Sequence, residues 1–254
     1  MQKMNQSSVF SNLQNPFKAP IYYKETSDST MVDASLLVPT EHGTLTAAGF
    51  QSKGKGRGEN RIWNSAKDKN LLFTIILNPK QISHPLVRAP LICGLALTKF
   101  LNHEYKLNAI LKWPNDVLVD NKKVSGILCE YKNNNLLVGL GINCLQMDFP
   151  SEIEHKSTSL RLQGVKETPP KILEAFLPIL KDTLESSHWK NEAMKYLFGW
   201  NKIIEIQTGS VEDSATESIQ IVDLTDDGFL VAINTKNNER LTISTGEIRF
   251  ADFI

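Results

Sequence analysis

The sequence predicts an α+β fold, with a mixed β-sheet flanked by helices and followed by a small C-terminal β-barrel. Two observations point to the sheet and its helices. Three segments are rich in apolar and β-branched residues, as buried strands are: 71–77, 117–119 and 136–142. Two longer segments, 90–105 and 170–185, carry leucines at helical spacing along one side. Pro90 suits a first helical turn, whereas Pro178 lies in a helix interior and is expected to kink or split it.

The third observation is a change of pattern after about Gly199. Short β-prone segments then follow one another: 203–207, 218–224, 228–234 and 240–244. Turn-forming residues separate them at 226–228 and 236–238. We therefore expect a catalytic domain over residues 1–195 and a small β domain over residues 196–254, with the linker within 187–201.

Bulk composition narrows the functional classes. The 254 residues include 28 Lys+Arg and 28 Asp+Glu, so the net charge gives no reason to expect nucleic acid or an anionic membrane as partner. The cysteines Cys93, Cys129 and Cys144 are odd in number and lie in apolar segments. Buried thiols in a reducing cytoplasm are the expectation, rather than disulfides or zinc. The five histidines are scattered, and no signal peptide or membrane span is expected.

Residues 51–61 form a loop rich in glycine and basic residues, QSKGKGRGENR, before Trp63. Glycines let a ligand approach the main chain, and the interleaved cations Lys55 and Arg57 can hold an anion. The spacing of a P-loop is absent. A solvated, mobile basic loop is the alternative interpretation of this segment alone.

A second motif spans residues 112–128, KWPNDVLVDNKKVSGIL, and predicts a hairpin with a polar turn. Lys123 lies at the exit of the turn, and Gly126 lies within the returning strand, where glycine often marks close approach by a ligand. A solvated turn would also explain Lys123. Trp113 could equally be a core residue beside a proline that begins a strand.

A third motif, LVGLGIN at 137–143, places Gly139, Gly141 and Asn143 on one face of a strand. A face without side chains can form a trough for a slim ligand. The alternative is a helix packed closely over the two glycines. The residues alone leave both open.

Together these motifs resemble the signature of the biotin–protein ligase catalytic domain. The resemblance rests on KWPND and KVSGIL, on the basic loop between Gln51 and Trp63, and on GLGIN at 139–143. It extends to the Asp-Ser-Thr element at residues 28–30, and to residues 244–248, which are similar to the family's small SH3-like domain. These five motifs follow the family's order from about residue 20 to the C-terminus.

The resemblance implies a class II synthetase-like fold of the biotin/lipoate ligase type. It also implies the activity of a biotin–[acetyl-CoA-carboxylase] ligase, which activates biotin with ATP and transfers it to a lysine. Mg²⁺ is expected to arrive with the ATP phosphates rather than in a protein cage. The expected partner is a biotin carboxyl carrier protein or carboxylase carrier domain, and the enzyme is expected to be a cytoplasmic monomer or homodimer.

The resemblance also assigns site residues. The catalytic set is Lys123, Lys55 and Arg57. The biotin-binding set is Ser29, Thr30, Met31, Gln51, Gly54, Lys55, Gly56, Arg57, Trp63, Lys123, Gly126, Gly139 and Gly141. The nucleotide-binding set is Arg57, Arg61, Asn115, Asp116 and Asn143. For Ser29 and Thr30, capping of the first helix is a second reading that can hold simultaneously. No protein ligands to a metal are assigned.

The chain departs from the family pattern at two positions. Lys55 stands where the family has the first arginine of the basic loop, and lysine lacks bidentate geometry, so Lys55 and Arg57 could exchange roles. Met31 stands where asparagine is common. Three rival functions remain: a lipoate or octanoate ligase or transferase, a ligase that also represses transcription, and a biotin-binding protein without catalysis. The missing Arg-Gly-Gly-Gly-His-Asp pattern argues against the first. For the second, we expect no helix-turn-helix domain because the signature begins near residue 25.

Overall fold

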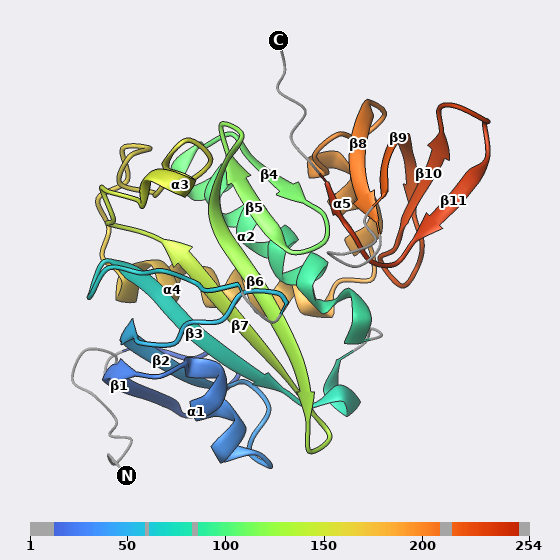
Figure 1. The fold of residues 1–254 in the computed structure, drawn as a ribbon. Coiled ribbons are helices and arrows are strands. Elements are labelled where there is room, and N and C mark those ends of the chain that lie inside the picture. Colours follow the sequence, from blue (N-terminus) through green and yellow to red (C-terminus); the bar gives the residue numbers. More distant parts are fainter. Residues whose placement is uncertain (1–12, 59–60, 83–85, 209–214, 249–254) are drawn as a thin grey trace.

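A computed structural model describes residues 13–58, 61–82, 86–208 and 215–248 of the chain. Within these ranges the larger sheet has seven strands in the order β1-β2-β3-β7-β6-β5-β4 (Figure 1). Their bounds are Ile21–Ser27 (β1), Thr44–Gln51 (β2), Asn70–Leu77 (β3), Ala109–Lys112 (β4), Asp116–Val119 (β5), Lys122–Lys132 (β6) and Asn135–Asn143 (β7). Residues 59–60 of the predicted basic loop and residues 249–254 of the predicted β domain lie outside the described residues.

The larger sheet is mixed, as predicted. Strands β1 and β2 are parallel and are joined through α1 (Thr30–Leu37), and the other neighbouring strands are antiparallel. The turn between β5 and β6 consists of Asp120 and Asn121, both with positive φ, which matches a two-residue hairpin turn. This turn fixes the register that brings Lys123 back beside β5.

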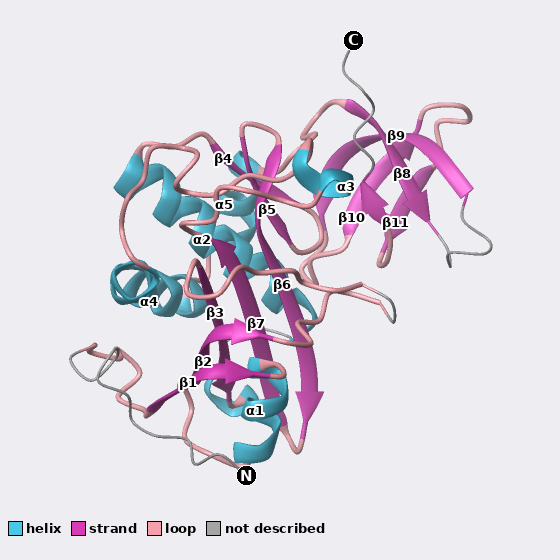
Figure 2. Cartoon of the chain, turned by 60° about the vertical axis from the view of Figure 1, so that its left-hand side comes forward, coloured by secondary structure: helices cyan, strands magenta, loops and turns pink. Residues whose placement is uncertain are grey.

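Helices cover the two faces of the larger sheet unequally. Helices α2 (Ala89–Tyr105) and α4 (Pro169–Glu185) lie on one side of the sheet with α5 (Trp189–Tyr196), as Figure 2 shows. Side chains alternate along β3, so Phe73 contacts the ring of Phe176 in α4, whereas Ile76 packs with Met31 and Ala34 of α1. The face that carries α1 is therefore covered over only part of its area by a helix.

Helix α4 passes through Pro178 without interruption, so the expectation that Pro178 splits it is wrong. The proline is exposed, and the buried face of the helix includes Phe176, Leu177 and Leu180. A proline in a helix interior costs about 3 kcal/mol or more. Burying one large apolar side chain contributes about 1.5–3 kcal/mol, so several of them offset that loss.

The smaller sheet is antiparallel, with the order β11-β10-β9-β8-β12. Its strands are Ile203–Thr208 (β8), Ala215–Leu224 (β9), Leu230–Asn234 (β10), Arg240–Ile243 (β11) and Glu247–Ile248 (β12). This sheet confirms a C-terminal β region, while closure into an SH3-like barrel and the boundary at 195–196 stay predictions. Helix α5 occupies the expected linker and buries Trp189.

The remaining elements are short. They are α3 (Ser151–Glu154) and the 3-10 turns Pro79–Gln81 and Leu86–Arg88. Among the described residues, no helix combines the length and apolar composition needed to cross a bilayer.

Candidate functional site

A pocket opens on the α1 face of the larger sheet, where β6 and β7 pass beneath the basic loop that follows β2. Its walls come from α1, β2, β3, β6, β7 and the loop. The lining residues are Ser29, Thr30, Met31, Gln51, Lys55, Gly56, Arg57, Trp63, Thr74, Asn115, Lys123, Gly126, Ile127, Leu128, Gly139, Leu140 and Gly141.

The fold brings most of the predicted site residues together. All of the predicted biotin-binding residues line the pocket except Gly54, and Arg57 and Asn115 of the nucleotide set line it too. Arg61, Asp116 and Asn143 are not among the lining residues. The ligand contacts of all these residues stay predictions. Sequence reasoning missed four lining residues: Thr74, Ile127, Leu128 and Leu140.

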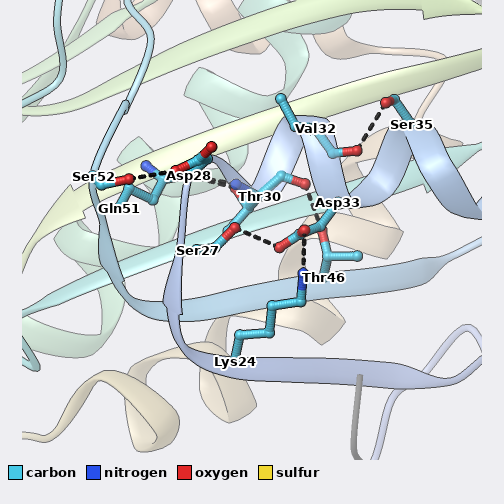
Figure 3. Close-up of polar contacts among 10 residues, drawn as sticks. All are labelled: Lys24, Ser27, Asp28, Thr30, Val32, Asp33, Ser35, Thr46, Gln51 and Ser52. Atoms are coloured by element: carbon cyan, nitrogen blue, oxygen red, sulfur yellow. Dashed lines mark hydrogen bonds and ion pairs between the residues drawn. The ribbon is translucent and has the colours of Figure 1, made fainter. Parts of the chain in front are cut away.

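The closed end of the pocket is a neutral hydrogen-bond network at the start of α1 (Figure 3). Gln51 Oε1 accepts hydrogen bonds from the Thr30 amide at 2.7 Å and from the Thr30 hydroxyl at 3.0 Å. Outside the pocket lining, Thr46 Oγ1 donates to the Thr30 carbonyl at 2.8 Å. Ser29 occupies the N-cap position, but its side chain makes no capping bond. Gln51, which comes from β2, therefore satisfies the first free amide of the helix.

A partly buried ion pair fixes α1 from its other side. Asp33 accepts from Lys24 Nζ and from Ser27 Oγ, both at 2.6 Å, as Figure 3 shows. Asp33 lies in the first turn of the helix, where negative charge is favourable. Contacts from β1 and β2 together hold the first turn of α1 in place, and with it the Thr30 side chain.

The described part of the basic loop folds back on itself. The Trp63 amide donates to the Gly54 carbonyl at 2.9 Å, and the Gly56 amide donates to the Arg61 carbonyl at 2.7 Å. Lys55 forms an isolated β-bridge with Ile62. The two arms therefore deliver Lys55, on the outgoing arm, and Trp63, on the returning arm, to the same pocket.

Two strand glycines provide the seat for the Trp63 indole. A Cβ on Gly141 would lie 2.5 Å from Trp63 Cε2, and one on Gly126 would lie 3.0 Å from Trp63 Cζ3. The first distance is too short for any side chain. The alternative of a helix packed over Gly139 and Gly141 applies only at Gly139, where a Cβ would lie 3.1 Å from Met31 Cε of α1; at Gly141 the Trp63 ring takes that place. The same ring forms one wall of the pocket. Gly126 and Gly141 therefore both receive the Trp63 ring and line the pocket beside it.

Lys123 lies at the mouth of the pocket. Its Nζ is 2.7 Å from Asp116 Oδ1 and 5.7 Å from the centre of the Trp63 ring. Its amide donates to Lys156 O at 2.8 Å, and its carbonyl accepts from the Thr158 amide at 2.9 Å. The backbone of Lys123 is thus held on both sides, and Asp116 orients the ammonium group.

Two further predicted nucleotide residues support this frame through their side chains. Asn143 Nδ2 donates to Thr158 O at 3.0 Å, next to the backbone of Lys123. Asn115 Nδ2 donates to Ile127 O at 2.9 Å, and the Ile127 amide donates to Asn115 O at 2.9 Å. The side-chain amides of Asn115 and Asn143 therefore hold the backbone around the pocket in place.

Carbonyl groups in the turns of the smaller sheet accept hydrogen bonds from the basic loop and from the KWPND motif. Arg57 Nη2 donates to Gly246 O at 2.6 Å, and the buried Trp113 Nε1 donates to Gly228 O at 3.0 Å. Arg88 in the turn before α2 donates to Asp226 O at 2.7 Å. The buried-core alternative for Trp113 is confirmed, and its partner lies in a turn of the C-terminal sheet.

No reactive thiol is available near the pocket among the described residues. Burial raises the pKa of Cys93 and of Cys144 to about 12, and raises the pKa of Cys129 well above 9.0. All three cysteines are free. Within the described ranges, no group of three His, Cys, Asp or Glu side chains could hold a metal ion. The charged residues that line the pocket are Lys55, Arg57 and Lys123.

Comparison with known proteins places this geometry in a family. Residues 22–147 match the biotin/lipoate A/B protein ligase family, a segment that includes every lining residue of the pocket. The chain belongs to this family. Over 91% of its length it superposes on the biotin protein ligase of Aquifex aeolicus in complex with biotin and ATP, with a TM-score of 0.78 and 27% identity, covering 97% of that protein.

Curated relatives carry the same similarity in sequence. The bifunctional ligase/repressor BirA of Bacillus subtilis is 32% identical over 152 residues, which is 55% of this chain and 46% of the relative. The human biotin–protein ligase is 24% identical over 244 residues, which is 88% of this chain and 33% of the relative. The chain thus spans about half, or less, of the length of these curated relatives.

Proposed function

We propose that this family member is an ATP-dependent biotin–protein ligase. In the first step, a carboxylate oxygen of biotin attacks the α-phosphorus of ATP, and the bond from that phosphorus to pyrophosphate breaks. In the second step, the ε-amine of an acceptor lysine attacks the carbonyl carbon of biotinyl-5′-AMP, loses a proton and releases AMP. The observation that carries the proposal is the meeting of Lys123, Lys55 and Arg57 at the mouth of a pocket with a neutral closed end.

The chemistry requires positioning and charge neutralisation rather than an enzyme nucleophile. Two anions, a carboxylate and a phosphate, repel each other, and cations fixed between them lower that repulsion. Lys123 is the best placed for this role because its backbone is held on both sides. Its pairing with Asp116 keeps the ammonium group at the pocket mouth until an anionic substrate competes for it.

The loop cations would act on the nucleotide. Arg57 offers a planar group suited to phosphate, and Lys55, the more exposed of the two residues, offers a point charge. Arg61, Asn115, Asp116 and Asn143 remain our candidates for the nucleotide side. Mg²⁺ would enter with the ATP phosphates. Its charge would add to that of the cations named here.

The acceptor in this proposal is a biotin carboxyl carrier protein or a carboxylase carrier domain. The relatives named as biotin–protein ligases support this class of acceptor. A cytoplasmic location is part of the proposal and agrees with free, protonated thiols. A monomer or a homodimer is compatible with it.

The direct test is transfer of biotin to an apo carrier domain by the purified chain in the presence of ATP and Mg²⁺. Mass spectrometry of the carrier should show one added biotin, and omission of ATP should prevent it. Lipoate and octanoate, offered at equal concentration, should not be transferred. Modification of the carrier by lipoate in place of biotin would overturn the proposed substrate.

A further inference from the structure

Thr74 carries a buried hydroxyl group in a strand whose other residues are apolar, apart from Asn70 at its start. It lies in the middle of β3, opposite Thr46 of β2 and Gly139 of β7, and has no exposed surface. A buried hydroxyl is costly unless it is hydrogen-bonded. Thr74 Oγ1 lies 2.9 Å from Thr30 Oγ1, at the closed end of the pocket. The partners of Thr30 decide which of these two hydroxyl groups is the hydrogen-bond donor.

The direction follows from Gln51. The Thr30 amide, which can only donate, lies 2.7 Å from Oε1, so this atom of Gln51 must be the oxygen. The Thr30 hydroxyl, 3.0 Å from the same oxygen, must then donate its single hydrogen there. Thr74 must in turn donate its single hydrogen to Thr30. Thr74 is left with only lone pairs to offer.

On the pocket side, the residue beside the Thr74 hydroxyl is Gly139, which has no side chain. A Cβ at Gly139 would lie 3.4 Å from Thr74 Oγ1 and 3.1 Å from Met31 Cε. Any side chain at residue 139 would therefore cover the hydroxyl oxygen. With glycine there, a shift of the flexible end of Met31 would let an occupant of the closed end reach the lone pairs of Thr74. A group that donates a hydrogen bond is the complement of such an acceptor.

We propose that Thr74 is a specificity-determining residue, whose hydroxyl oxygen accepts a hydrogen bond from an N–H of the substrate's head group. This inference rests on the proposed function. The favoured head group is a urea-type ring, which carries N–H groups. A dithiolane ring or a plain alkyl chain carries none and would leave the Thr74 oxygen buried without its second partner. Sites built to bond a polar group discriminate strongly against analogues that lack it.

Three substitutions distinguish the loss of this hydrogen bond from a change in side-chain packing. Thr74→Val keeps the shape and removes the oxygen, whereas Thr74→Ser keeps the oxygen. Thr46→Val is the matched control, because Thr46 is equally buried, lies directly opposite in the sheet, and donates to the Thr30 carbonyl instead of lining the pocket. Thermal unfolding of all three variants reports any loss of stability.

Calorimetry of the full chain with biotin, and separately with octanoate, provides the test. We expect Thr74→Val to raise the Kd for biotin by about tenfold or more, and to leave the Kd for octanoate unchanged. Thr74→Ser and Thr46→Val should stay within about threefold of the wild type. In turnover, Thr74→Val should raise the KM for biotin while kcat at saturation stays unchanged.

The outcomes separate this inference from the proposed function. If the wild type binds biotin and Thr74→Val binds it equally well, Thr74 does not select the head group. An equal loss in Thr46→Val would also overturn the inference, because it would trace the effect to the position of α1. If the wild type itself does not bind biotin, the proposed function fails.

Discussion

The two ends of the pocket are lined by side chains of different charge. At the closed end, Thr30, Gln51 and Thr74 are neutral and are joined to one another by hydrogen bonds of 2.7–3.0 Å. At the mouth, Lys55 and Lys123 are charged and reach the pocket from a loop and from the exit of a hairpin turn. Lys55 is exposed, and the Lys123 side chain retains 35% of its surface.

The difference follows from the cost of burying charge. An unpaired charge in an apolar interior is far more costly than a hydrogen-bonded hydroxyl or amide, so the buried end uses neutral groups. Cations near solvent retain part of their hydration and can move toward an anion. In the proposed function, the closed end would therefore select the acid, and the mouth would supply the cations for the reaction. Substitutions at the two ends should separate binding of biotin from its activation.

The largest effect is expected at the mouth, from Lys123→Ala. The variant removes a preorganised cation from the point where the proposed mechanism brings carboxylate and phosphate together, a loss that typically costs about 10²–10³-fold in kcat. Biotin-dependent exchange of pyrophosphate into ATP measures this step without an acceptor. The Kd for biotin should change much less, because the closed end is intact.

Lys122→Ala is the matched control for this experiment. Lys122 is the sequence neighbour of Lys123, is exposed, and is not among the lining residues. Its removal should leave pyrophosphate exchange within about twofold of the wild type. Equal losses in both variants would mean that general charge at the turn, rather than the placement of Lys123, drives the reaction.

The wall between the two ends is expected to be sensitive to a single methyl group. In Gly141→Ala the new Cβ would lie 2.5 Å from the Trp63 ring, so the indole must move out of its seat. Overpacking of this kind lowers the free energy of unfolding by about 1–3 kcal/mol. The Kd for biotin should rise as well, because Trp63 lines the pocket.

Gly139→Ala sharpens this test. Its new Cβ would first meet Met31 Cε at 3.1 Å, the flexible end of a side chain that can shift. The loss of stability in urea unfolding should therefore be smaller than for Gly141→Ala. A larger loss in Gly139→Ala would show that the glycine seat of Trp63 is not the tightest point of the wall.

A smaller effect is expected from Trp113→Phe, which tests whether the C-terminal sheet supports the mouth. The substitution removes the hydrogen bond from Trp113 Nε1 to Gly228 O, a loss of about 1 kcal/mol in the free energy of unfolding. The KM for ATP should rise, while the Kd for biotin stays at its wild-type value. A change in biotin affinity alone would contradict the division between the two ends.

The sequence was more informative about the mouth than about the closed end. Lys123, Arg57 and the strand glycines stand out because charges and glycines are unusual beside apolar strands. Thr74 is a single hydroxyl in an apolar strand, and only the register with Gly139 reveals that it faces a pocket. Arg57 and Trp113 donate to backbone carbonyls, which every residue has, so these partners cannot be identified from residue type.

The fold was predictable where local pattern and packing agree. The strand at 71–77 and the helix at 90–105 lie within one residue of β3 and α2. The prediction that Pro178 splits a helix was wrong because local propensity opposes a helix there, while the buried leucines around it favour one. Helix α5 was missed because its eight residues are too short to establish a periodic pattern.

Neither end of the pocket should depend on a cysteine, and the raised thiol pKa values make this testable. Burial raises the pKa of Cys93 and Cys144 from 9.0 to about 12, so the folded chain keeps these protons where an unfolded chain loses them. The resulting stabilisation is fully present below pH 9.0 and falls as pH rises from there toward 12. Urea unfolding at about pH 8 and about pH 10 should therefore show lower stability at the higher pH.

Thiol reagents at about pH 8 should label the native chain slowly and leave pyrophosphate exchange intact, since only the thiolate reacts. Rapid labelling of Cys129 with loss of activity would instead favour a transferase that uses a covalent thioester.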